Sequence, residues 1–498
     1  MLLARVLNRV TEKRMFLIKY KHTSIWTAER TVKSPFDDVV IPETTIAEYV
    51  WRDLGKWSDK TAVICGVTDR KYTYLELYRQ SQTFGASLRK KFKIQDGDVV
   101  TIMLSNSPEY ATVTLGILAA GGVASTINPL YTVYEAQKQI ATSETKLIVT
   151  SPENVNVVKE AIILSKLNIP VIIVDVDKDR PDNTVSFKEL VNDPHIDKDI
   201  LKGVKRSADD VSLLLYSSGT TGLPKAVELT NKNIVANCQQ QNAERCKKYN
   251  DTTVLFLASN HLVKSNHFEK LQNVLTGAAP LPQADVERFL SKMDHEVHFG
   301  QVYGCTEAGP VVTTTPNGHK DYSSVGFTLP NSELRIVDSE MNNMGPNELG
   351  ELLIKGPNVM KGYKNNSEAN SQVFVDGWLR SGDLAKIDES GYVTIADRLK
   401  ELIKVNAFQV PPAELESIIR EHPAVFDAAV VGVPDDKTGE KPKGFVVLNK
   451  DSSTSENDIM EYVSKRVAPY KKLKEVQFID SIPKNPSGKI LRRLLIGL

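Results

Sequence analysis

The chain has 498 residues, and its 62 lysines and arginines are balanced by 62 aspartates and glutamates. This balance excludes the basic field that nucleic-acid-binding proteins need, so we expect no nucleic-acid partner. Single hydrophobic cores stop growing near about 250–300 residues, so the length predicts at least two domains.

The first 34 residues differ from the rest, with eight lysines and arginines against two acidic residues. Arg5, Arg9 and Lys13 recur every four residues, and an apolar side is supplied by Leu2, Leu3, Val6, Leu7 and Val10. This pattern is typical of a mitochondrial targeting segment, although a plain basic tail fits it too. The chain does not end in Ser-Lys-Leu, yet a peroxisomal or cytoplasmic location stays open.

From residue 35 onward, short apolar segments alternate with helical patterns such as residues 74–92 and 134–141. This alternation predicts a largely parallel α/β sheet. The apolar run Ala111–Thr126 is shorter than the roughly 20 residues that span a bilayer, so we expect a buried helix and no transmembrane segment. Four cysteines without zinc-type spacing predict free thiols.

The pattern changes near residue 333 to short strands with tight turns, including a hairpin around Ser390–Gly391. After Arg398, helices and strands alternate again. We therefore predict an α/β protein. Residues 35–396 would form a large domain of parallel and mixed sheets with helices and a β-rich subdomain, and residues 397–498 a small, mobile α+β domain.

A donor-rich loop separates two apolar segments in "LLLYSSGTTGLPKAVELT", residues 213–230. Its hydroxyls and unhindered backbone N–H groups suit phosphate oxygens, and Lys225 adds a positive charge. The loop is not a Walker A motif, because the lysine lies three residues after Gly222 and a strand follows instead of a helix. A polar surface hairpin would fit this stretch if it stood alone.

Further motifs follow in a fixed order. They are "QVYGCTEAGP" (301–310), "GELLIKGPNVMKGY" (350–363), "GWLRSGDLAKID" (377–388), "DRLKELIKVNAFQV" (397–410) and "PKNPSGKILRR" (483–493). With the loop, they resemble the adenylate-forming superfamily over about residues 35–493. The branch they resemble most contains 4-coumarate–CoA ligases, firefly luciferase and acyl-CoA synthetases.

The resemblance implies an ATP-dependent acid–CoA ligase. A carboxylic acid would attack the α-phosphorus of ATP and release pyrophosphate, and the thiol of coenzyme A (CoA) would then displace AMP from the acyl adenylate. Mg²⁺ would accompany ATP. Neither step needs a nucleophilic side chain, so the protein would align the reactants and stabilise charge.

The resemblance also implies a nucleotide site. The residues that would hold the β- and γ-phosphates are Ser217, Ser218, Gly219, Thr220, Thr221, Gly222 and Lys225. Tyr303 would pack on adenine, Asp383 and Arg398 would contact the ribose side, and Gln301 and Gly304 would complete the site. From the residues alone, Tyr303 could instead belong to the core, and Asp383 could be a turn former.

The catalytic assignments follow from the same resemblance. Thr306 would contact the α-phosphate, and Glu307 would bind Mg²⁺, which prefers carboxylate oxygen. Lys489 would serve the adenylation step, and Lys404 and Gln409 would serve the transfer to CoA. The small domain would rotate about residues 397–400 to exchange these groups. Without the motifs, Glu307 and Lys489 would be expected on the solvated surface.

One feature departs from the family pattern. Only 78 residues separate Lys225 from Tyr303, so about 60 residues, or two βαβ units, are missing near residues 253–254. The missing segment normally carries a histidine, which His261 and His267 do not replace because they follow the junction. We expect unpaired strand edges beside an acyl pocket of which Gly277, Ala278 and Ala279 remain.

Smaller departures are Ala226, Val302 and Ala407, which stand where the family commonly has glycine. Two alternatives stay open. One is a luciferase-like monooxygenase, which shares the adenylation step. The other is a catalytically impaired, truncated chain that only binds nucleotide. The acid could be aromatic or aliphatic, and no oligomeric state is predicted.

Overall fold

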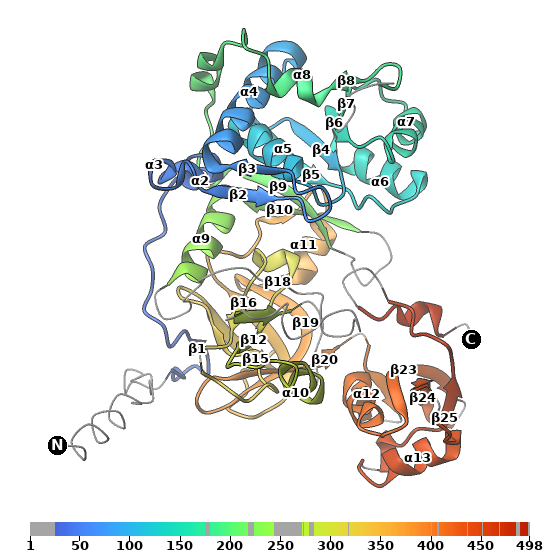
Figure 1. Cartoon of the computed structure of the whole chain (residues 1–498). Helices are drawn as coiled ribbons and strands as arrows, with labels where there is room; N and C mark the ends of the chain where they lie inside the picture. Colours follow the sequence, from blue (N-terminus) through green and yellow to red (C-terminus); the bar gives the residue numbers. More distant parts are fainter. Residues whose placement is uncertain are drawn as a thin grey trace, which may run out of the picture.

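The computed structural model describes most of the chain between Ile25 and Ile496 (Figure 1). The described ranges are 25–174, 180–217, 224–243, 271, 273–277, 283–316, 318–399, 401–405, 408–435, 437–450, 452–467, 469–484 and 489–496. Four larger sheets organise these residues, and the fold is the predicted α/β arrangement with a large N-terminal part and a smaller C-terminal part.

An eight-stranded sheet forms the upper part of the molecule in Figure 1. Its order is β17 (Gly362–Tyr363), β10 (Lys225–Thr230), β9 (Val211–Ser217), β5 (Val123–Thr126), β4 (Val99–Met103), β6 (Leu147–Thr150), β7 (Val171–Ile173) and β8 (Val185–Ser186). Strands from β9 to β8 are parallel, whereas β10 and β17 are antiparallel to their neighbours. The prediction of a largely parallel sheet is therefore confirmed.

Helices cover this sheet because its central strands are apolar on both faces; every residue of β4 is buried. The helices are α4 (Tyr74–Phe92), α5 (Pro108–Ala119), α6 (Val133–Ser143), α7 (Val155–Leu164), α8 (Phe187–Val191) and α9 (Asn231–Asn242). Shorter elements nearby are α2 (Ile46–Trp51), α3 (Leu54–Trp57), η1 (Lys198–Gly203) and the hairpin β2 (Thr61–Ile64) to β3 (Lys71–Thr73). Side-chain caps such as Thr73 on α4 and Thr230 on α9 fix where these helices begin.

The expectation of one buried helix over Ala111–Thr126 was partly wrong. Helix α5 ends at Ala119, Gly121 turns the chain with a φ of +78°, and β5 begins at Val123. Helix α5 packs closely on α4: a Cβ on Gly116 would lie 2.6 Å from a ring atom of Phe84 in α4. No helix in the described ranges is long and apolar enough to cross a membrane.

The second sheet contains β11 (Asn273–Thr276), β12 (His298–Tyr303), β13 (Thr313–Thr314) and β14 (Phe327–Thr328), with α10 (Gln283–Leu290) between the first two strands. Strand β11 runs parallel to β12, and β13 is antiparallel to β12 and β14. Within the part of the chain that the structure describes, β11 has no second neighbour and is an edge. Such an edge is what the shortened connection led us to expect.

The third sheet is antiparallel and has the order β1 (Val32–Lys33), β15 (Glu333–Val337), β16 (Gly350–Lys355), β19 (Trp378–Ile387) and β18 (Phe374–Val375), with β20 (Val393–Arg398) also paired to β19. Helix α11 (Ser367–Val373) precedes β18. The β19–β20 hairpin turns at Gly391, where φ is +91° and a side chain would be strained, which confirms the predicted hairpin.

Residues 25–34, which we had assigned to a targeting segment, belong to the fold. Strand β1 pairs with β15, Val32 is 1% exposed, and the Trp26 indole donates a hydrogen bond to the Asp388 carbonyl at 3.0 Å. Burying these apolar side chains ties the segment to the third sheet. The rest of the predicted targeting segment, residues 1–24, lies outside the described residues.

The C-terminal part has its own sheet and core (lower right in Figure 1). Its elements are β21 (Ile403–Val405), β22 (Phe408–Val410), α12 (Pro412–Arg420), β23 (Val425–Asp435), β24 (Gly439–Leu448), α13 (Glu456–Ser464), η4 (Pro469–Lys471), β25 (Glu475–Phe478) and η5 (Arg492–Leu494). Leu415, Ile419, Val430 and Val446 are fully buried between these helices and strands. The predicted small α+β unit is therefore present.

Candidate active site

The phosphate loop joins two paired strands. Ser217 ends β9 and lies directly opposite Lys225, which begins β10. The other predicted loop residues, Ser218, Gly219, Thr220, Thr221 and Gly222, lie outside the described residues. The strand–loop–strand arrangement agrees with the rejection of a Walker A motif, which requires a helix after the loop.

A buried hydrogen-bonded group joins three distant motifs. The Tyr303 hydroxyl at the end of β12 donates to Oδ2 of Asp383 at 2.6 Å, and the Arg398 Nε lies 3.2 Å from Oδ1 of the same carboxylate. The β19–β20 register places Asp383 opposite Arg398. The backbone N–H of Asp383 also donates to Ser381 Oγ, which fixes the backbone position of Asp383.

The electrostatics of this group follow from its burial. Burial raises the pKa of Asp383, and the Arg398 charge together with the Tyr303 hydrogen bond opposes that rise. Burial and the Asp383 charge raise the pKa of Tyr303 well above its usual value. Tyr303 is therefore a protonated donor. Its ring is buried in a hydrophobic cluster with residues such as Val227 and Ala308, so its predicted packing on adenine remains a prediction.

The turn after Tyr303 is tightly held. A Cβ on Gly304 would lie 1.8 Å from the Pro310 carbonyl oxygen, so no other residue fits without a shift of the backbone. The short helix η3 (Thr306–Ala308) follows, and the buried Asn358 amide donates to the Ala308 carbonyl at 2.6 Å. These contacts hold Thr306 and Glu307 beside Tyr303 without using their side chains.

Glu307 has a partner that the sequence analysis missed. The Tyr363 hydroxyl donates to Oε1 of Glu307 at 2.9 Å, and the Lys225 ammonium lies 5.0 Å from the centre of the Tyr363 ring. Tyr363 ends one of the quoted motifs, but its position depends on the pairing of β17 with β10. Ser217 Oγ is buried without a well-formed hydrogen bond, although it lies close enough to Tyr363 to oppose part of the rise in its pKa.

Lys489 is close to the Tyr303–Asp383–Arg398 group although it comes from the C-terminal tail. Burial and the Arg398 charge lower the pKa of Lys489, whereas Glu401 and Asp383 act in the opposite direction. Lys489 is also one of the charges that act on Asp383. The small domain thus brings the Lys489 charge near this group, and its role in the adenylation step remains a prediction.

Lys404 is placed differently. It is exposed in β21, opposite Gln409 in β22, and it is not among the charges that shift the pKa of Asp383. The predicted hinge begins at Asp397, whose carboxylate accepts hydrogen bonds from the backbone N–H groups of Arg398 and Ala413 at 2.7 and 2.9 Å. The other end of the hinge, Lys400, lies outside the described residues.

The predicted acyl side is described only in part. Gly277 follows β11, and a Cβ there would lie 2.8 Å from Val302 Cγ2, so Val302 fills the space beside it. Ala278 and Ala279 lie outside the described residues. Gln301 is buried, and its side-chain amide donates to the Tyr322 carbonyl, so its predicted nucleotide contact remains a prediction.

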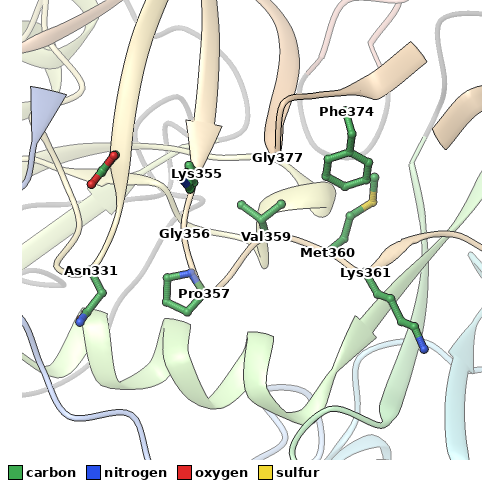
Figure 2. Close-up of a pocket in the computed structure, with 10 residues that line it drawn as sticks. Asn331, Lys355, Gly356, Pro357, Val359, Met360, Lys361, Phe374 and Gly377 are labelled. Atoms are coloured by element: carbon green, nitrogen blue, oxygen red, sulfur yellow. The ribbon is translucent and has the colours of Figure 1, made fainter. Parts of the chain in front are cut away.

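A separate pocket of about 610 Å³ opens beside the loop 355–361 (Figure 2). It is lined by Asn331, Glu333, Lys355, Gly356, Pro357, Val359, Met360, Lys361, Phe374 and Gly377. None of the predicted site residues lines it. Its wall touches the site through Met360, whose backbone N–H donates to the Glu307 carbonyl at 2.8 Å.

The described side chains could hold a metal ion only together with phosphate oxygens of a bound nucleotide. In the described ranges, no three His, Cys, Asp or Glu side chains are grouped to hold a metal ion. Mg²⁺ commonly binds through one or two carboxylates together with substrate phosphates. Glu307 meets that need, because Tyr363 occupies Oε1 and no described residue donates to Oε2.

The fold and this arrangement define an adenylate-forming enzyme, and comparison with known proteins gives the same class. The family model "AMP-binding enzyme" matches residues 50–264 and 257–364, and the model "AMP-binding enzyme C-terminal domain" matches residues 414–489. The chain therefore belongs to the AMP-binding enzyme family.

Its relatives are acid–CoA ligases. The chain is 34% identical to 4-coumarate–CoA ligase 1 of Petroselinum crispum, with 93% of this chain and 95% of the relative aligned. It is also 34% identical to 4-coumarate–CoA ligase 3 of Arabidopsis thaliana, with 93% of each chain aligned. The crystal structure of ATP-bound MatB from Rhodopseudomonas palustris superposes with a TM-score of 0.77 at 25% identity, covering 91% of this chain and 99% of MatB.

The comparisons also support the internal deletion. The alignment with the Petroselinum crispum ligase spans 528 positions, whereas 93% of this chain is about 463 residues, so about 65 positions have no residue here. The two matches to the family model meet at residues 257–264, close to the predicted junction. The missing length agrees with the predicted 60 residues.

Proposed function

We propose that the chain is an ATP-dependent acid–CoA ligase of the AMP-forming type. It would activate a carboxylic acid as an acyl adenylate and then transfer the acyl group to CoA. The observation that carries the proposal is the buried Tyr303–Asp383–Arg398 group with Lys489 among its neighbouring charges. Four separate motifs supply these residues.

The nucleotide would use both chemical features of this group. The Tyr303 ring would offer a flat apolar face to adenine, and Asp383 would offer acceptor oxygen to ribose hydroxyls. Lys225 and the loop residues 217–222 would bind the β- and γ-phosphates, because ammonium, hydroxyl and N–H donors all suit phosphate oxygen.

The first half-reaction brings together two anions, the carboxylate of the acid and the triphosphate. Attack of a carboxylate oxygen on the α-phosphorus forms the acyl–phosphate bond and breaks the bond to pyrophosphate. The Lys489 ammonium would offset the charge of both anions, and Thr306 would orient the α-phosphate. Mg²⁺ held by Glu307 and the phosphates would neutralise phosphate charge when bound.

The second half-reaction would follow a rotation of the small domain about residues 397–400. Lys404 and Gln409, which are paired across β21 and β22, would then replace Lys489 at the site. The CoA thiol would attack the acyl carbonyl and displace AMP. Exposure of Lys404 in the present arrangement is consistent with a residue that acts only after rotation.

The acid would be an aromatic or fatty carboxylic acid, and the names of the relatives favour testing aromatic acids first. The luciferase-like alternative has no observation in its favour. A second candidate function, nucleotide binding without turnover, is favoured by the internal deletion beside the acyl side of the site.

The experiment is acid-dependent exchange of pyrophosphate into ATP by the purified chain, with Mg²⁺ and a panel of aromatic and fatty acids. We expect exchange that is lost in Lys489→Ala and kept in Lys484→Ala, a lysine of the same tail that pairs with Asp427. Lys404→Ala should keep the exchange and lose thioester formation. Folded protein that binds ATP without exchange with any acid would support the second candidate instead.

We also propose that residues 1–24 direct the chain to mitochondria, on the basic amphipathic pattern of Arg5, Arg9 and Lys13. Residues 1–24 fused to a fluorescent protein should then enter mitochondria, and replacing the three basic residues by glutamine should leave the fusion in the cytosol. Unchanged cytosolic fluorescence of the unmodified fusion would overturn the proposal.

A further inference from the structure

Tyr363 connects two groups that the proposed function places on the phosphate side of ATP. Its hydroxyl donates to Glu307 at 2.9 Å, and its ring lies 5.0 Å from the Lys225 ammonium. Glu307 and Lys225 come from motifs far apart in sequence. Tyr363 is the described residue that contacts both of these side chains.

The position of Tyr363 is fixed from several sides. In β17 it pairs with Val227 of β10, two residues after Lys225. The Asn370 amide accepts from the Tyr363 N–H at 2.7 Å and donates to its carbonyl at 3.0 Å. Only 7% of Tyr363 is exposed, so the side chain is held by packing as well as by these bonds.

The hydroxyl can act only as a donor to Glu307. A carboxylate oxygen accepts hydrogen bonds and a phenol keeps its proton at neutral pH, so the hydroxyl is the donor of this 2.9 Å bond. By occupying Oε1, the hydroxyl fixes the plane of the carboxylate and leaves Oε2 for another ligand. Partners of a ligating carboxylate commonly set its orientation and the metal affinity of the site.

We propose that Tyr363 is a positioning residue that orients the Glu307 carboxylate toward a divalent cation bound with the triphosphate, while its ring sets the distance to Lys225. This inference rests on the proposed function, because it needs a nucleotide at the site. The second anchor of Glu307, the bond from Met360 N–H to its carbonyl, holds the backbone but leaves the carboxylate free to turn. The hydroxyl of Tyr363 therefore supplies the missing constraint.

The test is Tyr363→Phe, which keeps the ring and its contact with Lys225 and removes only the hydroxyl. The matched control is Tyr72→Phe, because Tyr72 donates to Oε1 of Glu109 at the same 2.9 Å in a different sheet. Both variants lose a hydrogen bond to a carboxylate, so both should lose a similar amount of stability. Only the first loss should change the binding of metal.

The readout is the affinity of Mn²⁺ in the presence of saturating α,β-methylene-ATP, measured from the free Mn²⁺ signal in electron paramagnetic resonance. We expect Tyr363→Phe to weaken Mn²⁺ binding about tenfold, the scale of one hydrogen bond to a charged group. Tyr72→Phe should change it by less than about twofold, and metal-free binding of the nucleotide should be similar in all three proteins.

The outcomes distinguish the proposed role of Tyr363 from the proposed ligase function. Equal Mn²⁺ affinities in the wild type and in folded Tyr363→Phe would refute the role of Tyr363 and leave the ligase proposal intact. Failure of the wild type to bind the nucleotide at all would overturn both. If Tyr363→Phe does not fold, Tyr363→Leu removes the hydroxyl with a smaller apolar side chain; weaker Mn²⁺ binding by the folded variant would support the role, and unchanged binding would refute it.

Discussion

Replacing the buried Asp397, where the predicted hinge begins, by asparagine should change how the stability of the protein depends on pH. Burial raises the pKa of Asp397 to about 6 from a usual 3.8, despite hydrogen bonds from the N–H groups of Ala413 and Arg398 and the charge of Arg492. Asparagine has nearly the same shape and can accept the same bonds, but it cannot ionise. The variant therefore isolates the cost of burying the charge.

The sign follows from the raised pKa. The native state binds the Asp397 proton more tightly than the unfolded chain, so the associated stability is fully present below pH 3.8 and is lost as the pH rises through 6. A shift of two pKa units corresponds to about 3 kcal/mol. Between about pH 4 and about pH 7.5, Asp397→Asn should therefore gain about 3 kcal/mol of unfolding free energy relative to the wild type.

Equilibrium urea unfolding followed by circular dichroism, with both proteins in the same buffers, measures this difference. Asp59→Asn is the control, because Asp59 is exposed. Its replacement should change the unfolding free energy by the same amount at both pH values. A free-energy difference between Asp397→Asn and the wild type that stays constant across this pH range would refute the argument. It would mean that Asp397 is ionised in the native state with little cost.

Two further predictions concern stability. Gly304→Ala should lower the unfolding free energy by more than about 1–3 kcal/mol and reduce ATP affinity, because its Cβ would meet the Pro310 carbonyl at 1.8 Å. Thermal melting and ATP titration measure the two effects. The control Gly55→Ala, with no atom within 4 Å of the new Cβ, should be neutral in both assays. Arg492→Met should destabilise the small domain by about 3–5 kcal/mol, because it leaves the buried Glu416 carboxylate without the guanidinium now 2.6 Å away; unchanged urea unfolding would show that this pair contributes little.

The strand–loop–strand unit around Lys225 and the β19–β20 hairpin were predictable because they depend on neighbouring residues. The turn chemistry of Ser390–Gly391 and the spacing of apolar segments are local signals. The motifs likewise indicated which side chains would gather at the nucleotide, and the structure does bring Tyr303, Asp383 and Arg398 together.

The partnership between Glu307 and Tyr363 could not be predicted in the same way. The two residues are 56 positions apart, and their contact depends on the register of β17 against β10. The raised pKa of Asp397 was also hidden, because it results from burial against the small domain. Both features are set by tertiary contacts that no local pattern of residues encodes.

The internal deletion affects the two sides of the site unequally. On the nucleotide side, the β10–β17 pairing, the Tyr303–Asp383 bond and the Glu307–Tyr363 bond are each formed between residues outside the shortened segment. On the acyl side, β11 is an edge within the described residues, and the chain just after Gly277 lies outside them.

Because the nucleotide contacts do not use the shortened segment, we expect ATP affinity to persist while the range of accepted acids narrows or shifts. Inserting the corresponding segment of a 4-coumarate–CoA ligase near residues 253–254 should therefore change acid selectivity more than ATP affinity in the pyrophosphate-exchange assay. A comparable gain in ATP affinity would show that the two sides are coupled through the second sheet.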